Sequence, residues 1–243
     1  MNITRKVTLR DASPLVGTEI AIWVSGEATG ETDGFTFAIS RIALSNSSAT
    51  FTIEWGDGSS ELLEETATEL IHTYQRAGLY RIRISDDVSS IRVSSGTDTI
   101  FATVYAPMVK EFRSNAQRMT SIPRISLRNA TGLELLELRG SAVRSLGGSA
   151  FEGCSSLRSL DGCAGVEQIG MSTFAGCTNL PVRVDLPSIN YISASTNSSP
   201  FENTNIKEFH FAAKNEEAIR TLQIFYDTNG TFGVEGAVCI FDL

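Results

Sequence analysis

The second half of the chain repeats its hydrophobic positions at a fixed spacing of 23 residues. The segment VRSLGGSAFEGCSSL (143–157) returns as VEQIGMSTFAGCTNL (166–180), with small residues matched as well as large ones. The matched apolar pairs are Val143 with Val166, Leu146 with Ile169, Phe151 with Phe174, Cys154 with Cys177, and Leu157 with Leu180. A fixed period of this length is typical of a solenoid, in which each unit stacks on the next.

Weaker copies of the same pattern flank the two central units. An earlier copy at a spacing of 24 residues lies in 119–136, a degenerate one ends in 106–112, and a later one begins at 189 and is interrupted before Phe201. About five units of 23 to 24 residues result. Because one such unit cannot bury its apolar side alone, we expect Leu133, Leu157 and Leu180 to form one buried ladder and Phe151 to stack on Phe174.

The period ends after residue 211, where a different pattern begins. Residues 215–222 predict a short helix with acidic residues in its first turn, and residues 236–241 predict a strand. Together they would cover the open end of the solenoid, since an exposed strand edge invites aggregation. We therefore expect a C-terminal helix-strand cap from about residue 212.

The first half alternates apolar and polar residues in the manner of β-strands. Strands are predicted at 35–39, 51–55 and 79–84, with turns at Gly56-Asp57-Gly58 and Ala77-Gly78. Residues 3–9 and 20–24 offer further strands, and whether 1–34 complete this β-domain is left open. The predicted domains are an antiparallel β-sandwich over 1–94 and a solenoid over 95–243, with a right-angled change of architecture near residue 95.

Two stretches resemble known families. The strings AFEGCSSL and TFAGCTNL are similar to the BspA-like leucine-rich repeats of bacterial surface proteins, over roughly residues 100–211. That resemblance implies a solenoid with a ligand-facing sheet, usually assigned to adhesion or protein recognition. The strings IEWGDGSS and IHTYQRAGLYRIRIS resemble the PKD-like (Ig-like) β-sandwich family over 35–85. The resulting fold class is mostly β with short helical turns.

Composition and charge narrow the possible partners. The 243 residues are 42% hydrophobic and 20% charged, as in an ordinary globular protein. The net charge of −8 and the lack of a Lys/Arg stretch argue against nucleic acid, and no apolar run approaches the roughly eighteen residues that cross a bilayer. We expect a monomer without membrane insertion. It would be extracellular or on the cell surface if an export signal was removed, and otherwise virion-associated or cytoplasmic.

Few residues suggest catalysis or metal binding. Asp57, with Glu54 and the acidic cluster over residues 61–69, would suit calcium, but a turn aspartate that bonds its own backbone is favoured, and the question stays open. The two histidines, His72 and His210, lie in no GxSxG or HExxH arrangement. We therefore predict no catalytic residue, no cofactor and no enzyme.

The four cysteines are Cys154, Cys163, Cys177 and Cys239, and they lack the close paired spacing of a zinc site. Cys154 and Cys177 would lie one rung apart, which admits a disulfide or a metal, but small buried thiols that fill the solenoid core are favoured. Cys163, in the predicted loop 161–166, is the expected reactive thiol.

The remaining candidate is the polar surface beside the apolar ladder. Alignment of the units places Arg113, Glu137, Asp161 and His210 in one column, joined by Asp185 if the fourth unit shifts by one residue. A mixed-charge column suits contact with a protein or glycan, and it also suits a plain solvated face.

The leading hypothesis is a non-enzymatic protein-interaction or adhesion module, in which the solenoid sheet binds the ligand and binding survives removal of residues 1–90. The alternatives are a fibre-associated structural protein of a phage or prophage and an accessory domain of a carbohydrate-active enzyme. Fold alone does not decide among them.

Overall fold

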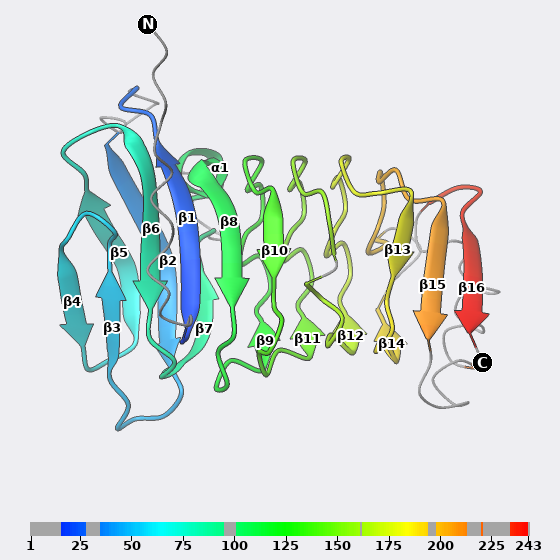
Figure 1. The fold of residues 1–243 in the computed structure, drawn as a ribbon, viewed down its shortest axis with the longest axis horizontal. Coiled ribbons are helices and arrows are strands. Elements are labelled where there is room, and N and C mark those ends of the chain that lie inside the picture. Colours follow the sequence, from blue (N-terminus) through cyan, green and yellow to red (C-terminus); the bar gives the residue numbers. More distant parts are fainter. Residues whose placement is uncertain are drawn as a thin grey trace, which may run out of the picture.

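The computed structural model describes residues 16–27, 35–94, 101–160, 162–193, 198–212, 220 and 234–242. Figure 1 shows an elongated arrangement, in which antiparallel strands at the N-terminal end pass into a stack of parallel turns that ends near the C-terminus. The predicted class, mostly β with a solenoid after an antiparallel region, is confirmed.

The N-terminal part consists of two antiparallel sheets. One contains β1 (Thr18–Val24), β6 (Gly78–Ile84), β3 (Phe51–Glu54) and β4 (Ser60–Leu63). The other contains β5 (Ala67–Thr73), β2 (Thr36–Leu44) and β7 (Val88–Arg92). The predicted strands at 20–24, 35–39, 51–55 and 79–84 are confirmed, whereas the one at 3–9 lies outside the described residues. The PKD-like assignment stays a prediction.

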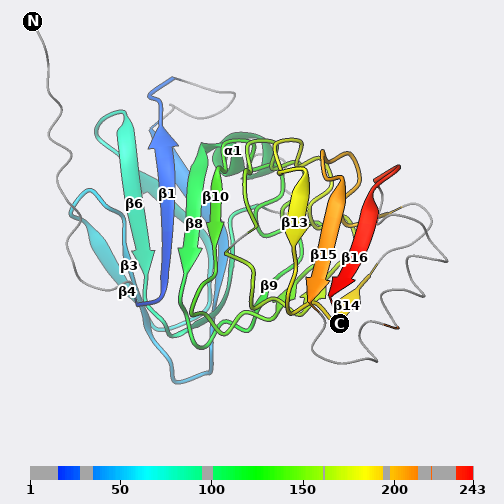
Figure 2. The ribbon, with the colours of Figure 1, turned by 45° about the vertical axis from the view of Figure 1, so that its right-hand side comes forward.

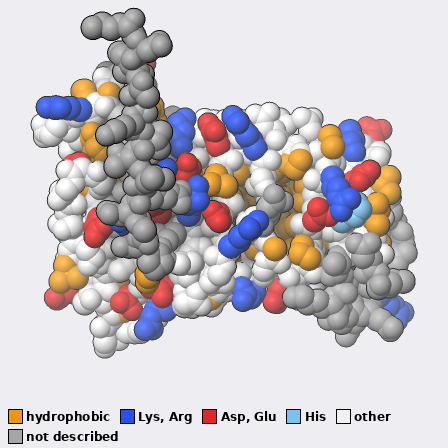
Figure 3. Space-filling model, in the orientation of Figure 1, with side chains coloured by type: hydrophobic (Ala, Val, Ile, Leu, Met, Phe, Trp, Pro, Cys, Tyr) orange, Lys and Arg blue, Asp and Glu red, His pale blue; other side chains and the backbone are white. Residues whose placement is uncertain are grey.

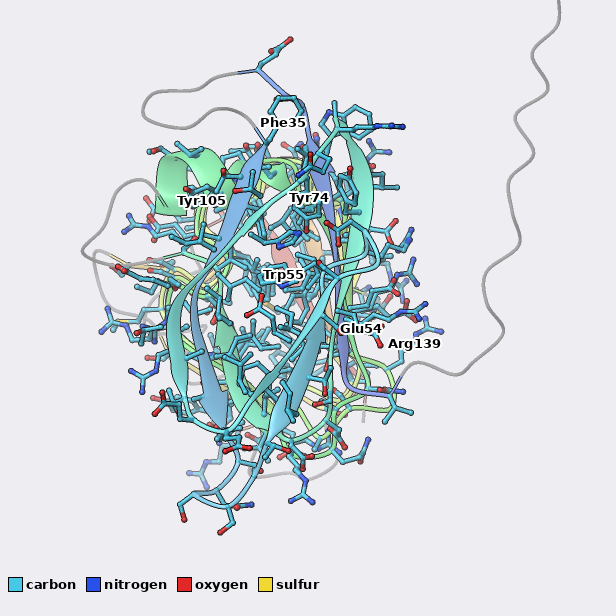
Figure 4. The ribbon with its side chains drawn as sticks, turned by 90° about the vertical axis from the view of Figure 1, so that its left-hand side faces the viewer. Phe35, Glu54, Trp55, Tyr74, Tyr105 and Arg139 are labelled. Atoms are coloured by element: carbon cyan, nitrogen blue, oxygen red, sulfur yellow. The ribbon has the colours of Figure 1, made fainter. Side chains whose placement is uncertain are left out.

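Large aromatic side chains fill the space between these two sheets. Trp55 and Tyr74 are buried, and Figure 4 shows them between the layers. The hydroxyl of Tyr74 donates a hydrogen bond to the backbone oxygen of Trp55, at 3.0 Å, so its one polar group is satisfied within the core.

The first sheet does not stop at the N-terminal part, because solenoid strands extend it. Strand β8 (Val109–Ser114), reached through a π-helical turn η1 (Phe101–Tyr105) and one turn of α-helix α1 (Ala106–Met108), pairs antiparallel with β1. It also pairs in parallel with β10 (Leu135–Glu137), which gives the order β10-β8-β1-β6-β3-β4. The prediction of a right-angled change near residue 95 is therefore wrong. Pairing with β8 satisfies the backbone groups along one edge of β1, so the sheet continues across the junction.

The solenoid has strands on two sides, and Figure 2 labels some of each set, with β9 and β14 apart from β13, β15 and β16. On the back lie β9 (Ser121–Ile122), β11 (Ser145–Leu146), β12 (Gln168–Ile169) and β14 (Tyr191–Ile192), paired in parallel. On the front, β13 (Arg183–Asp185), β15 (Glu208–Ala212) and β16 (Val238–Asp242) form a second parallel sheet. The parallel pairing of equivalent residues, such as Leu146 with Ile169, confirms the repeat.

The predicted ladders form the solenoid core. Leu133, Leu157 and Leu180 are buried. The ring of Phe174 lies 5.5 Å from Phe151 and 5.5 Å from Phe201, stacked on both. Small residues allow this close stacking of turns, because a Cβ on Gly170 would lie 2.5 Å from the backbone nitrogen of Gly148.

The C-terminal cap is described only in part. Strand β16 continues the front sheet beside β15 and confirms the predicted strand at 236–241. The predicted helix over 215–222 lies, apart from residue 220, outside the described residues. The aromatic stack reaches this strand through Phe211, whose ring is 5.4 Å from that of Phe241.

Three of the four cysteines are buried core residues, and the fourth, Cys239, is half-buried. The thiols of Cys154 and Cys177 donate to the backbone oxygens of Leu127 and Phe151, each at 3.2 Å, and burial raises the pKa of Cys154 well above its usual value. The prediction that Cys163 is the reactive thiol is wrong, since it is buried with 3% of its surface exposed. Cys239 is half-buried, and burial raises its pKa to about 12.

We expect all four cysteines to be free and slow to react in the folded protein. A thiol reagent at pH 8 should label almost none of them in the native state, because burial disfavours the reactive thiolate. After denaturation without a reductant it should label four. Two missing thiols would demonstrate a disulfide and contradict the expectation.

Candidate binding surface

The strands β8, β10, β13 and β15, which carry most of the predicted column of polar residues, lie on the side of the solenoid that Figure 1 presents to the viewer. We call the outward side chains of β8, β10, β13 and β15 the front face. Arg113 on β8 and Glu137 on β10 are register partners, and so are Asp185 on β13 and His210 on β15. The structure thus brings the residues together as two pairs. The one-residue shift that places Asp185 in the column is present.

The middle of the column differs from the alignment. Asp161 lies outside the described residues, and the residue that bridges to Glu137 is Gly162. A Cβ on Gly162 would lie 2.5 Å from the backbone oxygen of Leu136, so the chain passes very close to β10 here. The two pairs are accordingly in separate sheets, one that ends at β10 and one that begins at β13.

The first pair belongs to a longer series of ion pairs that crosses from the N-terminal part into the solenoid. Arg113 Nη1 is 2.7 Å from Glu137 Oε2, and its Nε is 3.1 Å from Glu111 Oε2. Arg81 Nη1 is 3.0 Å from Glu111 and 2.7 Å from Glu19. We call these residues, together with Arg83, the charged row. The sequence shows acidic and basic residues two apart, but only the pairing of β6, β1 and β8 reveals the row.

The charges of this row stabilise each other. Partial burial alone would raise the pKa of Glu111, but hydrogen bonds from Arg81 and Arg113 outweigh it and hold the pKa below its usual value. The hydrogen bond to Glu111 raises the pKa of Arg81 in turn. Both shifts favour the charged forms of Glu111 and Arg81. Figure 3 shows acidic and basic side chains interspersed over this side of the molecule.

The second pair has more exposed neighbours. Arg183 Nη2 donates to Asp185 Oδ1 at 2.8 Å, and this hydrogen bond lowers the pKa of Asp185, although both side chains are more than half exposed. Val182, which precedes Arg183, is 62% exposed. Val238 is 54% exposed and lies on β16, where it pairs with Glu208, the register partner of Arg183. Exposed apolar surface next to fixed charges is typical of a contact region for a macromolecule.

The polar residues of the WGDG turn have a structural explanation. Asp57 accepts hydrogen bonds from the backbone N–H of Ser59 at 3.0 Å and from its hydroxyl at 2.6 Å, and it pairs with His72 Nε2 at 2.8 Å. Burial alone would raise the pKa of Asp57, but these contacts lower it to about 2. The ring of His72 stacks on Trp55 at 4.7 Å. The hydroxyl of Ser59 donates its hydrogen bond to the carboxylate of Asp57 and not to the imidazole of His72. These three residues therefore lack the hydroxyl–imidazole pair of a hydrolase.

The described residues contain no group of three or more His, Cys, Asp or Glu side chains placed to hold a metal ion. Within the acidic cluster, Glu61 Oε1 accepts a hydrogen bond from the indole of Trp55 at 2.7 Å, which ties this glutamate to the core. No helix in the described part of the chain is long and apolar enough to cross a membrane.

Comparison with known proteins identifies the repeats. A family model described as BspA type leucine rich repeat region matches residues 105–230 in six copies. No curated protein matches the chain. A leucine rich cell surface protein from Faecalibacterium prausnitzii A2-165 is 20% identical with a TM-score of 0.35, and the match covers 58% of this chain and 40% of that one. Because the repeat model covers more than half of the 243 residues, the chain belongs to the BspA-type leucine-rich repeat family.

Proposed function

We propose that the protein is a non-enzymatic recognition or adhesion module that binds a protein or glycan ligand on the front face. The observation that carries the proposal is the exposed Arg183–Asp185 pair, which shares its sheet with the exposed apolar residues Val182 and Val238. The solenoid core fixes the position of this sheet. A rigid sheet presents these side chains without ordering a loop, so little conformational entropy is lost on binding.

The charges of the front face favour selectivity over raw affinity. Mixed signs in a fixed row attract a complementary partner and repel others, whereas a single sign would attract any opposite charge. Family membership supports the same class of function, since BspA-like repeats are usually assigned to adhesion or protein recognition. The serine, aspartate and histidine of the WGDG region are occupied by the turn, which leaves no nominated nucleophile among the described residues.

Reversal of charge at Asp185 tests the proposed face. In the full chain, Asp185→Arg should weaken binding of a ligand found on glycan and extracellular-protein arrays by about tenfold, as the loss of one good polar contact does. The melting temperature should stay within about 2 °C of the wild type, because exposed ion pairs contribute little to stability.

Glu202→Arg is the matched control, since it makes the same change of charge at an exposed residue outside the front face. It should leave affinity unchanged. Equal losses in the two variants would mean that net charge, and not this face, determines binding. An unaffected Asp185→Arg together with unaffected Glu137→Arg would place the binding site elsewhere.

A further inference from the structure

Three arginines gather on the back of the molecule, where the N-terminal part meets the solenoid. Arg41 on β2 and Arg92 on β7 are directly opposite each other in the antiparallel register. Strand β7 leads into the first solenoid turn, since the backbone N–H groups of Val93 and Ser94 both donate to the oxygen of Ser126. Arg124 lies two residues before Ser126 in the chain. Its positive charge is close enough to Arg92 to lower the pKa of Arg92.

This cluster lacks the carboxylates that neutralise arginines elsewhere in the structure. Arg81 and Arg113 of the charged row and Arg183 of the front face all have acidic partners. In contrast, Arg41, Arg92 and Arg124 form no ion pair with a described residue. Nε of Arg92 is also buried without a hydrogen-bond partner in the described structure. The chain carries 28 acidic residues against 20 basic ones, so the arrangement does not reflect a shortage of carboxylates.

Without a bound anion, such a cluster lowers the stability of the folded protein. Like charges directly across a strand pair repel each other, and a buried donor without a partner loses its hydrogen bond to water. Burial, with the like charges of Arg41 and Arg124, lowers the pKa of Arg92. An anion between these side chains would remove both costs at once.

We propose that Arg41, Arg92 and Arg124 form a binding site for a tetrahedral oxyanion, a sulfate or phosphate monoester carried by a ligand. Guanidinium groups bind such anions through paired N–H donors. Three guanidinium groups from three segments match the several oxygens of a tetrahedral group better than the two oxygens of a carboxylate. The site belongs to β2, β7 and the turn after β9, so it is separate from the front face and does not depend on the function proposed there.

Thermal unfolding of the full chain in sodium sulfate and in sodium chloride, at matched ionic strength, tests the site. The wild type should melt at a higher temperature in sulfate, with a gain that saturates as a single site fills. Arg41→Gln should melt slightly above the wild type in chloride, because repulsion is relieved, and should lose the saturable gain. Arg139→Gln removes an exposed arginine that follows β10 and is labelled in Figure 4, and this variant should gain from sulfate as the wild type does.

Calorimetric titration with glucose 6-sulfate and with glucose 6-phosphate shows which of the two esters binds. The ester that binds the wild type should bind Arg41→Gln about tenfold more weakly. The proposal is overturned if Arg41→Gln is less stable than the wild type in chloride, or if sulfate stabilises both equally.

Discussion

Deletion of residues 1–94 is expected to leave the repeat half aggregated or strongly destabilised. The deletion removes β1, which pairs with β8 from Thr18 to Ile22, and it exposes one edge of the first solenoid strand. It also removes Glu19 and Arg81 and leaves Glu111 with fewer partners. An unpaired strand edge both loses hydrogen bonds and recruits other chains.

Size-exclusion chromatography and circular-dichroism melting of residues 95–243 provide the measurement. We expect aggregates, or a melting temperature at least about 10 °C below that of the full chain, which a loss of about 3 kcal/mol already causes in a domain of this size. A chain that begins at residue 16 retains β1 and is the matched control. A monomeric 95–243 that melts at the wild-type temperature would show that the solenoid is independent, and the expectation that binding survives removal of residues 1–90 would then become testable.

The solenoid could be predicted because its residues repeat. Phe151 and Phe174 occupy equivalent positions, so one spacing in the sequence specifies one contact in space. The alignment placed Asp185 in the column only if the fourth unit shifts by one residue, and the register of Asp185 with His210 supplies that shift. This reasoning fails where a unit departs from the repeat. The spacing of the repeats does not predict the bridge from Glu137 to Gly162.

The junction could not be predicted in the same way. The pairing of β1 with β8 joins Thr18 to Ser114, and no periodicity connects residues 96 positions apart. The charged row depends on that pairing. The meeting of Arg41 and Arg92 depends in the same way on the pairing of β2 with β7. Alternation predicts which residues face outward, but the choice of neighbouring strand is a property of the whole sheet.

The aromatic ladder carries the second large effect, and Phe174→Ala should lower the free energy of unfolding by about 3 to 5 kcal/mol. Phe174 is buried and stacks on Phe151 and Phe201, with interplanar angles of 7° and 13°. The substitution therefore leaves a cavity in the centre of the ladder and also removes two stacking contacts, each worth about 0.5 to 1.5 kcal/mol beyond burial. Urea unfolding followed by circular dichroism measures the change.

Two variants distinguish loss of the ladder from loss of any aromatic side chain. Phe174→Leu fills most of the volume and should cost less than Phe174→Ala, whereas Tyr191→Ala removes a half-exposed ring from the next unit and should cost under about 1 kcal/mol. Turns of a solenoid contact only their neighbours, so a cavity in one turn can separate the unfolding of the turns on either side. We expect Phe174→Ala to lower the denaturant dependence of the transition as well, because the single transition broadens into two that overlap. A cost below about 1 kcal/mol with an unchanged slope would contradict the central position of Phe174 in the core.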